Sequence, residues 1–147
     1  MDIARKSYGS ALNAAIRIAA AVIRDRQGRV LLVRKRGTSA FMQPGGKIDA
    51  DESALAALAR EVCEELGCRI RPATARFLGR FAAAAANEAG QNVLADLFAV
   101  AVDGDVRPAA EIEEVVWVDA AAPGAYRLAP LTRDLILPLL LTEDGQC

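Results

Sequence analysis

The apolar positions of the chain fall into short runs separated by segments rich in Gly, Asp, Asn and Arg. Runs of this length, rich in Val, Ile, Leu and Ala and bounded by turn residues, are typical of β-strands. They predict strands at residues 16–23, 30–33, 76–83, 93–102 and 112–118. Because a short turn at 25–28 separates the first two strands, that pair resembles a β-hairpin.

A spacing of three and four residues replaces these runs at 52–66 and predicts a helix there. The apolar stripe of this helix consists of Leu55, Leu58, Val62 and Leu66. Gly67 follows directly, where a glycine commonly ends a helix in the left-handed conformation. Acidic residues precede the helix, which suits its positive N-terminal end.

A second helix is predicted at 128–141, with Thr132 as a candidate cap and Pro138 near its end. The order is thus two strands, a helix, several strands and a helix, which indicates the α/β class, a mixed sheet with helices packed on it. The sequence shows no linker or repeat, so we expect one domain over residues 1–147, with 1–10 as a flexible or peripheral segment.

Composition narrows the chemistry that this domain can carry. Its 147 residues are 53% hydrophobic and 25% charged, as in a globular protein with a sizeable core. The net charge of −1 provides no basic field for a nucleic-acid polymer. Histidine is absent, so acid–base and metal chemistry falls to carboxylates, which favour hard ions such as Mg²⁺ or Mn²⁺.

The cysteines and the apolar runs indicate in which cellular compartment the protein is expected. Cys63, Cys68 and Cys147 are odd in number and form no Cys-x-x-Cys pair, so a disulfide framework is not expected. The run at 14–23 is interrupted by Arg17 and is too short to cross a bilayer. We therefore expect a cytoplasmic protein without a membrane partner.

Three carboxylates, Glu61, Glu64 and Glu65, share one face of the helix at 52–66. Like charges at this spacing repel each other, which a helix tolerates when a cation neutralises them. At about 100° per residue, this face lies beside the apolar stripe and therefore at the edge of the packed interface. The pattern indicates a cation site near a cleft.

These residues belong to a longer pattern that resembles the Nudix box, G-x5-E-x7-R-E-U-x-E-E-x-G-U, where U is a bulky aliphatic residue. The last position departs from it, since Cys68 is a smaller apolar residue that affects packing and not the chemistry. The positions that match are Gly46, Glu52, Arg60, Glu61, Val62, Glu64, Glu65 and Gly67. The resemblance extends more weakly over nearly the whole chain and implies the α/β/α sandwich of the Nudix family.

The resemblance also implies a magnesium-dependent hydrolase that drives water onto a phosphorus atom of a nucleoside diphosphate derivative. It suggests Glu61 and Glu65 as the principal metal ligands, assisted by Glu64 and by the backbone carbonyl of Gly45. Magnesium prefers oxygen ligands of this kind, and manganese is a natural substitute. Arg60 is expected to orient the catalytic carboxylates.

Residues outside the box are assigned candidate roles from their positions in the sequence. Among the glutamates ahead of Trp117, Glu114 is the candidate general base, with a box glutamate as the alternative. Within the basic segment at 34–36 that leaves the second strand, Arg34 and Arg36 are candidate contacts to the phosphates. Phe41 and Gln43, just before the Pro-Gly-Gly segment, are candidates for recognising the base or leaving group.

The first functional hypothesis is a nucleotide pyrophosphohydrolase that releases a nucleoside monophosphate and pyrophosphate. The alternatives are hydrolysis of ADP-ribose, a nucleotide sugar or a dinucleotide polyphosphate, and a Nudix-like module that binds a nucleotide without cutting it. Such modules usually lose box glutamates, which this chain retains. The expected partner is a small nucleotide, and a homodimer remains open.

Overall fold

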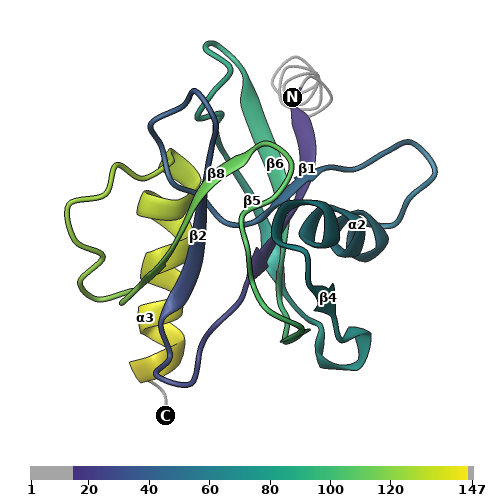
Figure 1. The fold of residues 1–147 in the computed structure, drawn as a ribbon. Helices are drawn as coiled ribbons and strands as arrows, with labels where there is room; N and C mark the ends of the chain where they lie inside the picture. Colours follow the sequence, from purple (N-terminus) through teal and green to yellow (C-terminus); the bar gives the residue numbers. More distant parts are fainter. Residues whose placement is uncertain (1–14, 146–147) are drawn as a thin grey trace, which may run out of the picture.

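The computed structural model describes residues 15–145, and a four-stranded sheet forms its centre (Figure 1). The strand order is β3-β1-β6-β5. Its strands are β1 (Ile16–Val22), β3 (Gly45–Lys47), β5 (Arg76–Ala84) and β6 (Asn92–Ala99). Because β1 is parallel to β6 while the β1–β3 and β5–β6 pairs are antiparallel, this is a mixed sheet, as predicted.

Two smaller antiparallel pairs complete the strands. They are β2 (Val30–Lys35) with β8 (Ile112–Val118), and β4 (Arg69–Ile70) with β7 (Val102–Asp103). The bounds of β8 agree with the predicted strand at 112–118, and those of β5 extend the prediction by one residue.

The predicted hairpin at 16–33 is wrong beyond its turn. Arg24 bridges to Val30 beside the turn, but β1 and β2 then separate into different sheets. The reason is that both edges of β1 are occupied, one by β3 and the other by β6. Likewise, the predicted strand at 93–102 ends early, because Val102 pairs with Ile70 in β4 instead of continuing β6.

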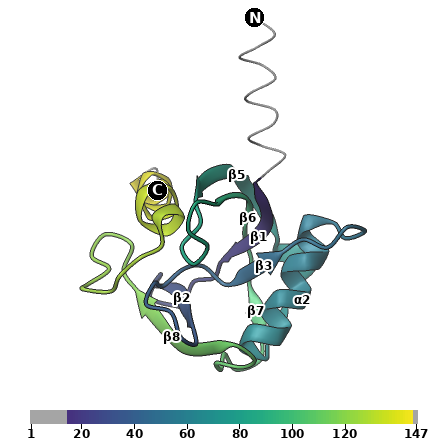
Figure 2. The same ribbon diagram turned by 90° about the horizontal axis from the view of Figure 1, so that it is seen from above.

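Helices cover the strands from two sides (Figure 2). They are α2 (Ala54–Leu66) on one side, and on the other the π-helical segment η2 (Thr132–Ile136) continued by α3 (Leu137–Gly145). A short 3-10 turn, η1 (Pro72–Thr74), precedes β5. None of the helices between residues 15 and 145 has the length and apolar character needed to cross a membrane.

The C-terminal helix differs in detail from its prediction. It begins at Pro130 instead of residue 128, and Thr132 lies inside it, so its assignment as a cap is wrong. The Thr132 hydroxyl instead donates to the side chain of Gln43. Pro138 also lies inside the helix, just after a wider turn in which Leu137 N–H donates to the carbonyl of Thr132. Because proline clashes with a regular helical turn before it, this widening accommodates Pro138.

The core has two parts, one on each face of β1. Ala20 and Val22 face the α3 side, whereas Ala19 and Ala21 face α2. The strand is therefore buried on both faces, which explains why its sequence is a continuous apolar run without clear alternation.

The cysteines within the described range are free, Cys63 exposed and Cys68 buried. Cys147 and the predicted peripheral segment at 1–10 lie outside the described residues.

Candidate active site

Helix α2 is placed so that its acidic face meets strand β3. The Ser53 hydroxyl caps the helix by accepting the Ala56 N–H at 3.1 Å, and Gly67 ends it with φ of 68°. Leu58 and Val62 are fully buried against β1 and its neighbours. The predicted arrangement, an acidic face at the edge of the packed interface, is therefore present.

Glu65 is the most buried of the three carboxylates, with 2% of the residue exposed. One of its oxygens accepts the backbone N–H of Gly45 at 3.0 Å. Burial, assisted by the nearby charge of Glu61 and opposed by the Gly45 hydrogen bond, raises the pKa of this carboxyl to about 8. A carboxyl held this way favours either a proton or a metal cation as its neutralising partner.

Glu61 lies against the backbone of Gly46. A Cβ atom at Gly46 would overlap the Glu61 carboxylate, so glycine leaves the room that this side chain uses. Burial raises the pKa of Glu61, the charge of Arg60 lowers it, and that of Glu64 raises it. Glu64 is the exposed member of the three, with 54% of its side chain accessible.

Gly45 holds β3 close to β1. Its φ is 146°, and a Cβ atom there would collide with the backbone oxygen of Ala19 and lie 2.9 Å from the Cα of Ala20. A side chain at this position is therefore excluded both by backbone conformation and by space. This close approach brings the Gly45 N–H to Glu65.

Arg60 connects the start of α2 to its acidic face. Its guanidinium donates to both carboxylate oxygens of Glu52, each at 2.8 Å. The same group lies 3.4 Å from Glu61 and 3.8 Å from Glu64. Hydrogen bonds from Arg60 and from the Asp49 backbone lower the pKa of Glu52 to about 2. Arg60 is thereby anchored at Glu52 with its charge beside the cluster.

Replacing Arg60 by glutamine is expected to lower kcat/KM by about 10- to 100-fold, the usual cost of losing a group that supports a metal ligand. The reason is that Glu61 and Glu64 lose the cation that orients them. The matched control is Arg26→Gln, in an exposed turn. Steady-state kinetics of both variants test this, and equal rates for Arg60→Gln and Arg26→Gln would contradict it.

The oxygen donors around α2 suit a hard divalent cation. Within residues 15–145, no three His, Cys, Asp or Glu side chains are already gathered in the geometry of a complete metal site. However, burial raises the pKa values of both the Glu61 and the Glu65 carboxyl, and a bound divalent cation would favour their ionised forms. Glu64 is exposed and free to join them, and the Gly45 carbonyl is a further oxygen donor. This donor set fits magnesium or manganese.

Stability should depend on pH in a way that reports Glu65. Its pKa is about 8 in the folded protein and 4.5 ordinarily, so the folded state keeps a proton that the unfolded chain releases. The metal-free protein should therefore lose stability as pH rises from about 4.5 to about 8. We expect Tm to fall by about 5 °C or more over this range.

Magnesium should cancel most of that fall, because it neutralises the same carboxylate, and Glu65→Gln should flatten the profile without metal. Thermal unfolding measured across pH, with chelator or with magnesium, checks this. A metal-free Tm that is constant or rises from pH 5 to 8 would contradict the placement of Glu65.

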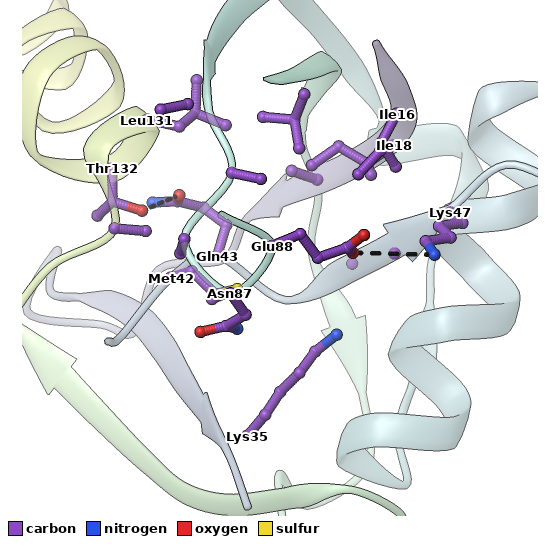
Figure 3. A pocket seen from close by; sticks show the side chains of 18 of the residues that line it. Ile16, Ile18, Lys35, Met42, Gln43, Lys47, Asn87, Glu88, Leu131 and Thr132 are labelled. Atoms are coloured by element: carbon purple, nitrogen blue, oxygen red, sulfur yellow. Dashed lines mark hydrogen bonds and ion pairs between the residues drawn. The ribbon is translucent and has the colours of Figure 1, made fainter. Parts of the chain in front are cut away.

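A pocket lies between strands β1 and β3 and the start of the C-terminal helix (Figure 3). Lys35 of β2 and Lys47 of β3 line it, and Glu88, another lining residue, lies 3.8 Å from Lys47. Gly45 and Gly46 belong to the same wall. The pocket and the carboxylates therefore share a boundary.

The structure separates the predicted basic residues from this pocket. Arg34 pairs with Glu114 at 2.8 Å, and Arg36 donates to the carbonyl of Ala110 at 3.3 Å. Of residues 34–36, it is Lys35 that lines the pocket. Alternation along β2 explains this, because Leu31 and Val33 face α2, and Lys35 continues their side. Counting outward from the buried residues would have identified Lys35.

Glu114 does not meet the box carboxylates. Val116 and Val118 of the same strand face the α3 side of the core, and Glu114 shares their side. Its partner is Arg34. Glu111 instead lies near α2, 3.3 Å from Lys35, and its charge raises the pKa values of Glu61 and Glu65. A bulge between Arg34 and Lys35 shifts the register here, which the sequence pattern did not reveal.

The two candidate recognition residues, Phe41 and Gln43, occupy different environments. Gln43 lines the pocket. Phe41 is 6% exposed and packs in the core, with its ring centroid 4.9 Å from that of Tyr126. Thr132 also lines the pocket, a role that the sequence pattern, which predicts a helix cap there, does not indicate.

Comparison with known proteins agrees with the resemblance of the sequence to the Nudix family. A family model described as the NUDIX domain matches residues 15–138. The fold is similar to that of a MutT protein from Methanosarcina mazei Go1, with 27% identity, TM-score 0.71 and coverage of 90% of this chain and 94% of that one. A MutT NUDIX hydrolase from Burkholderia pseudomallei has 25% identity and TM-score 0.73, covering 86% and 98%. The ORF135 protein of E. coli has 25% identity and TM-score 0.73, covering 90% and 92%.

Proposed function

This chain belongs to the Nudix hydrolase family, and we propose that it hydrolyses a nucleoside triphosphate to a nucleoside monophosphate and pyrophosphate, with magnesium as its metal. The observation that carries the proposal is the shared boundary of pocket and helix. Gly45 and Gly46 line the pocket and also contact the carboxylates of Glu65 and Glu61. A nucleoside in the pocket would therefore have its phosphates beside the acidic face.

In the proposed site, Glu61, Glu64, Glu65 and the Gly45 carbonyl hold the metal. When bound, a divalent ion neutralises phosphate charge, orients the phosphate and lowers the pKa of a coordinated water. The Gly45 N–H orients one Glu65 oxygen, and the charge of Arg60 lowers the pKa of Glu61 against the larger, opposite effect of burial. Lys35, which lines the pocket, would contact the phosphates.

Glu111 is better placed than Glu114 to accept a proton near the box. We expect Glu111→Gln to reduce kcat by about 100-fold, the lower end of the range for a general base. Glu114→Gln, a matched change on the opposite face, should have near-normal turnover because Glu114 contacts Arg34 and not α2. Kinetics of the two variants test this assignment, and a larger loss in Glu114→Gln would reverse it.

The experiment that tests the proposed reaction is a hydrolysis screen with magnesium present and the products identified. It compares nucleoside triphosphates, ADP-ribose, nucleotide sugars and dinucleotide polyphosphates. We expect the highest kcat/KM for a triphosphate, with pyrophosphate as a product. A preference for any of the other classes would move the substrate assignment there, and tight binding without hydrolysis would indicate a sensor module.

A further inference from the structure

The side chain of Gln43 has one amide nitrogen, Nε2, that donates no hydrogen bond within the described residues. The residue is 6% exposed, and its Oε1 accepts the Thr132 hydroxyl at 2.6 Å. In the described part of the chain, Gln43 Nε2 is the buried side-chain polar atom without a hydrogen-bond partner. A buried donor left unpaired destabilises a protein, so such groups usually have a functional partner.

Gln43, the residue that carries this donor, lines the pocket (Figure 3). The surrounding wall is largely apolar, with Ile18, Val93 and Leu131 among its residues. Pockets of this kind fix the orientation of a ligand through a few placed polar groups. A ligand that supplies an acceptor to Nε2 satisfies Gln43, whereas a ligand that presents a donor leaves both groups unpaired.

Thr132 determines which end of the carboxamide serves the ligand. The Thr132 residue is fully buried, and its hydroxyl donates to Oε1, so the amide nitrogen is the end of the carboxamide that has no partner. Thr132 is the first residue of the π-helical segment η2, in the turn that accommodates Pro138. Wider turns of this kind are frequent at functional sites in helices. The helix therefore holds Gln43 as a donor.

We propose that the pocket selects nucleotides whose base presents a carbonyl oxygen, which accepts a hydrogen bond from Gln43 Nε2. Bases that present an amino group at the same edge are disfavoured because two donors then face each other. This selection among nucleotides rests on the proposed function, because it presupposes that the enzyme hydrolyses a nucleoside triphosphate. Gln43 is a specificity-determining residue in this scheme, and Thr132 is a positioning residue that acts through it.

The test compares nucleotides that differ at one ring position. ITP has a carbonyl where ATP has an amino group, and UTP and CTP differ in the same way. We expect the wild-type kcat/KM to favour ITP over ATP and UTP over CTP by about 10- to 100-fold, the value of one hydrogen bond to a buried group. Equal values for both pairs would overturn the proposal.

Two variants separate the donor from its orientation. Gln43→Leu should bring both ratios close to 1 by lowering the rates with ITP and UTP. Thr132→Val should also lower the ratios, but by raising the rates with ATP and CTP, because the carboxamide can then rotate. The controls are Gln27→Leu, in an exposed turn, and Thr142→Val, whose hydroxyl donates to the Pro138 carbonyl outside the pocket. Retention of the wild-type ratios in both pocket variants would overturn the assignment.

Binding of IMP and AMP to the metal-free wild-type protein, measured by calorimetry, gives a readout that does not depend on cleavage. Tighter binding of IMP than of AMP supports the selection even if no triphosphate is hydrolysed. The absence of hydrolysis would refute only the proposed reaction. Hydrolysis of all triphosphates with equal binding of IMP and AMP would leave the reaction in place and refute the selection. If Gln43→Leu does not fold, Thr132→Val and the wild-type ratios decide.

Discussion

Glutamine in place of Glu65 is expected to lower kcat by two orders of magnitude or more, and Glu61→Gln should do the same. Each change removes a negative charge where the proposed site concentrates it, at a cost of roughly 3–4 kcal/mol in the barrier. Glu65 is nearly inaccessible to water, and its oxygen is held by the Gly45 N–H, so a neutral amide cannot replace it as a metal ligand.

Both variants should fold, because the apolar stripe of α2 is untouched. At pH 8 without metal, Glu65→Gln should be more stable than the wild type, since the buried carboxyl with a pKa of about 8 is absent. The control is Asp105→Asn, an exposed carboxylate in the turn after β7. Kinetics with saturating magnesium provide the measurement. Rates near wild type in both glutamate variants would refute the metal-site assignment.

The second large effect concerns the adjacent glycines Gly45 and Gly46. Replacing the first by alanine should lower stability, whereas replacing the second should lower turnover. At Gly45, the new Cβ meets backbone atoms of Ala19 and Ala20 at positive φ, so β3 must move away from β1. We expect Gly45→Ala to lower the free energy of unfolding by about 3 kcal/mol or more. At Gly46, the three atoms nearest to the new Cβ all belong to the end of the Glu61 side chain.

Gly46→Ala should therefore change the free energy of unfolding by less than about 1 kcal/mol, while it lowers kcat by about 100-fold through displacement of Glu61. Gly28→Ala separates the effect of conformation from that of contact. This glycine has φ of 80° but open space around its Cβ position, so alanine there should cost about 1–2 kcal/mol. Denaturant unfolding and kinetics are measured on all three variants, and a stable, fully active Gly46→Ala would contradict the geometry.

The acidic face of α2 was predictable because its determinants are local. The spacing of Glu61, Glu64 and Glu65 decides which side chains share a face, and the apolar stripe decides which face is buried. The glycine that ends the helix is also a local signal. These features depend on residues within one helix, so the sequence alone was sufficient to place them.

The residues that complete the site depend on non-local pairings, which local patterns do not encode. The parallel pairing of β1 with β6 joins residues 77 positions apart, such as Ile16 and Val93, and it displaces β2 from the expected hairpin. The pairing of β2 with β8 then brings Lys35 and Glu111 to the α2 side and leaves Arg34 with Glu114 on the other. Local preference predicts Thr132 as a helix cap, because threonine favours caps, whereas its hydroxyl donates to Gln43, 89 positions away.

Water is expected to attack a phosphorus atom beside the acidic face of α2. Single-turnover hydrolysis of the preferred triphosphate in ¹⁸O-labelled water, followed by mass spectrometry of the products, tests this attack most directly. The expected products are a nucleoside monophosphate and pyrophosphate, with one ¹⁸O atom on a phosphate group of one of them. Inorganic phosphate and a nucleoside diphosphate as primary products, or phosphate products without label, would contradict it.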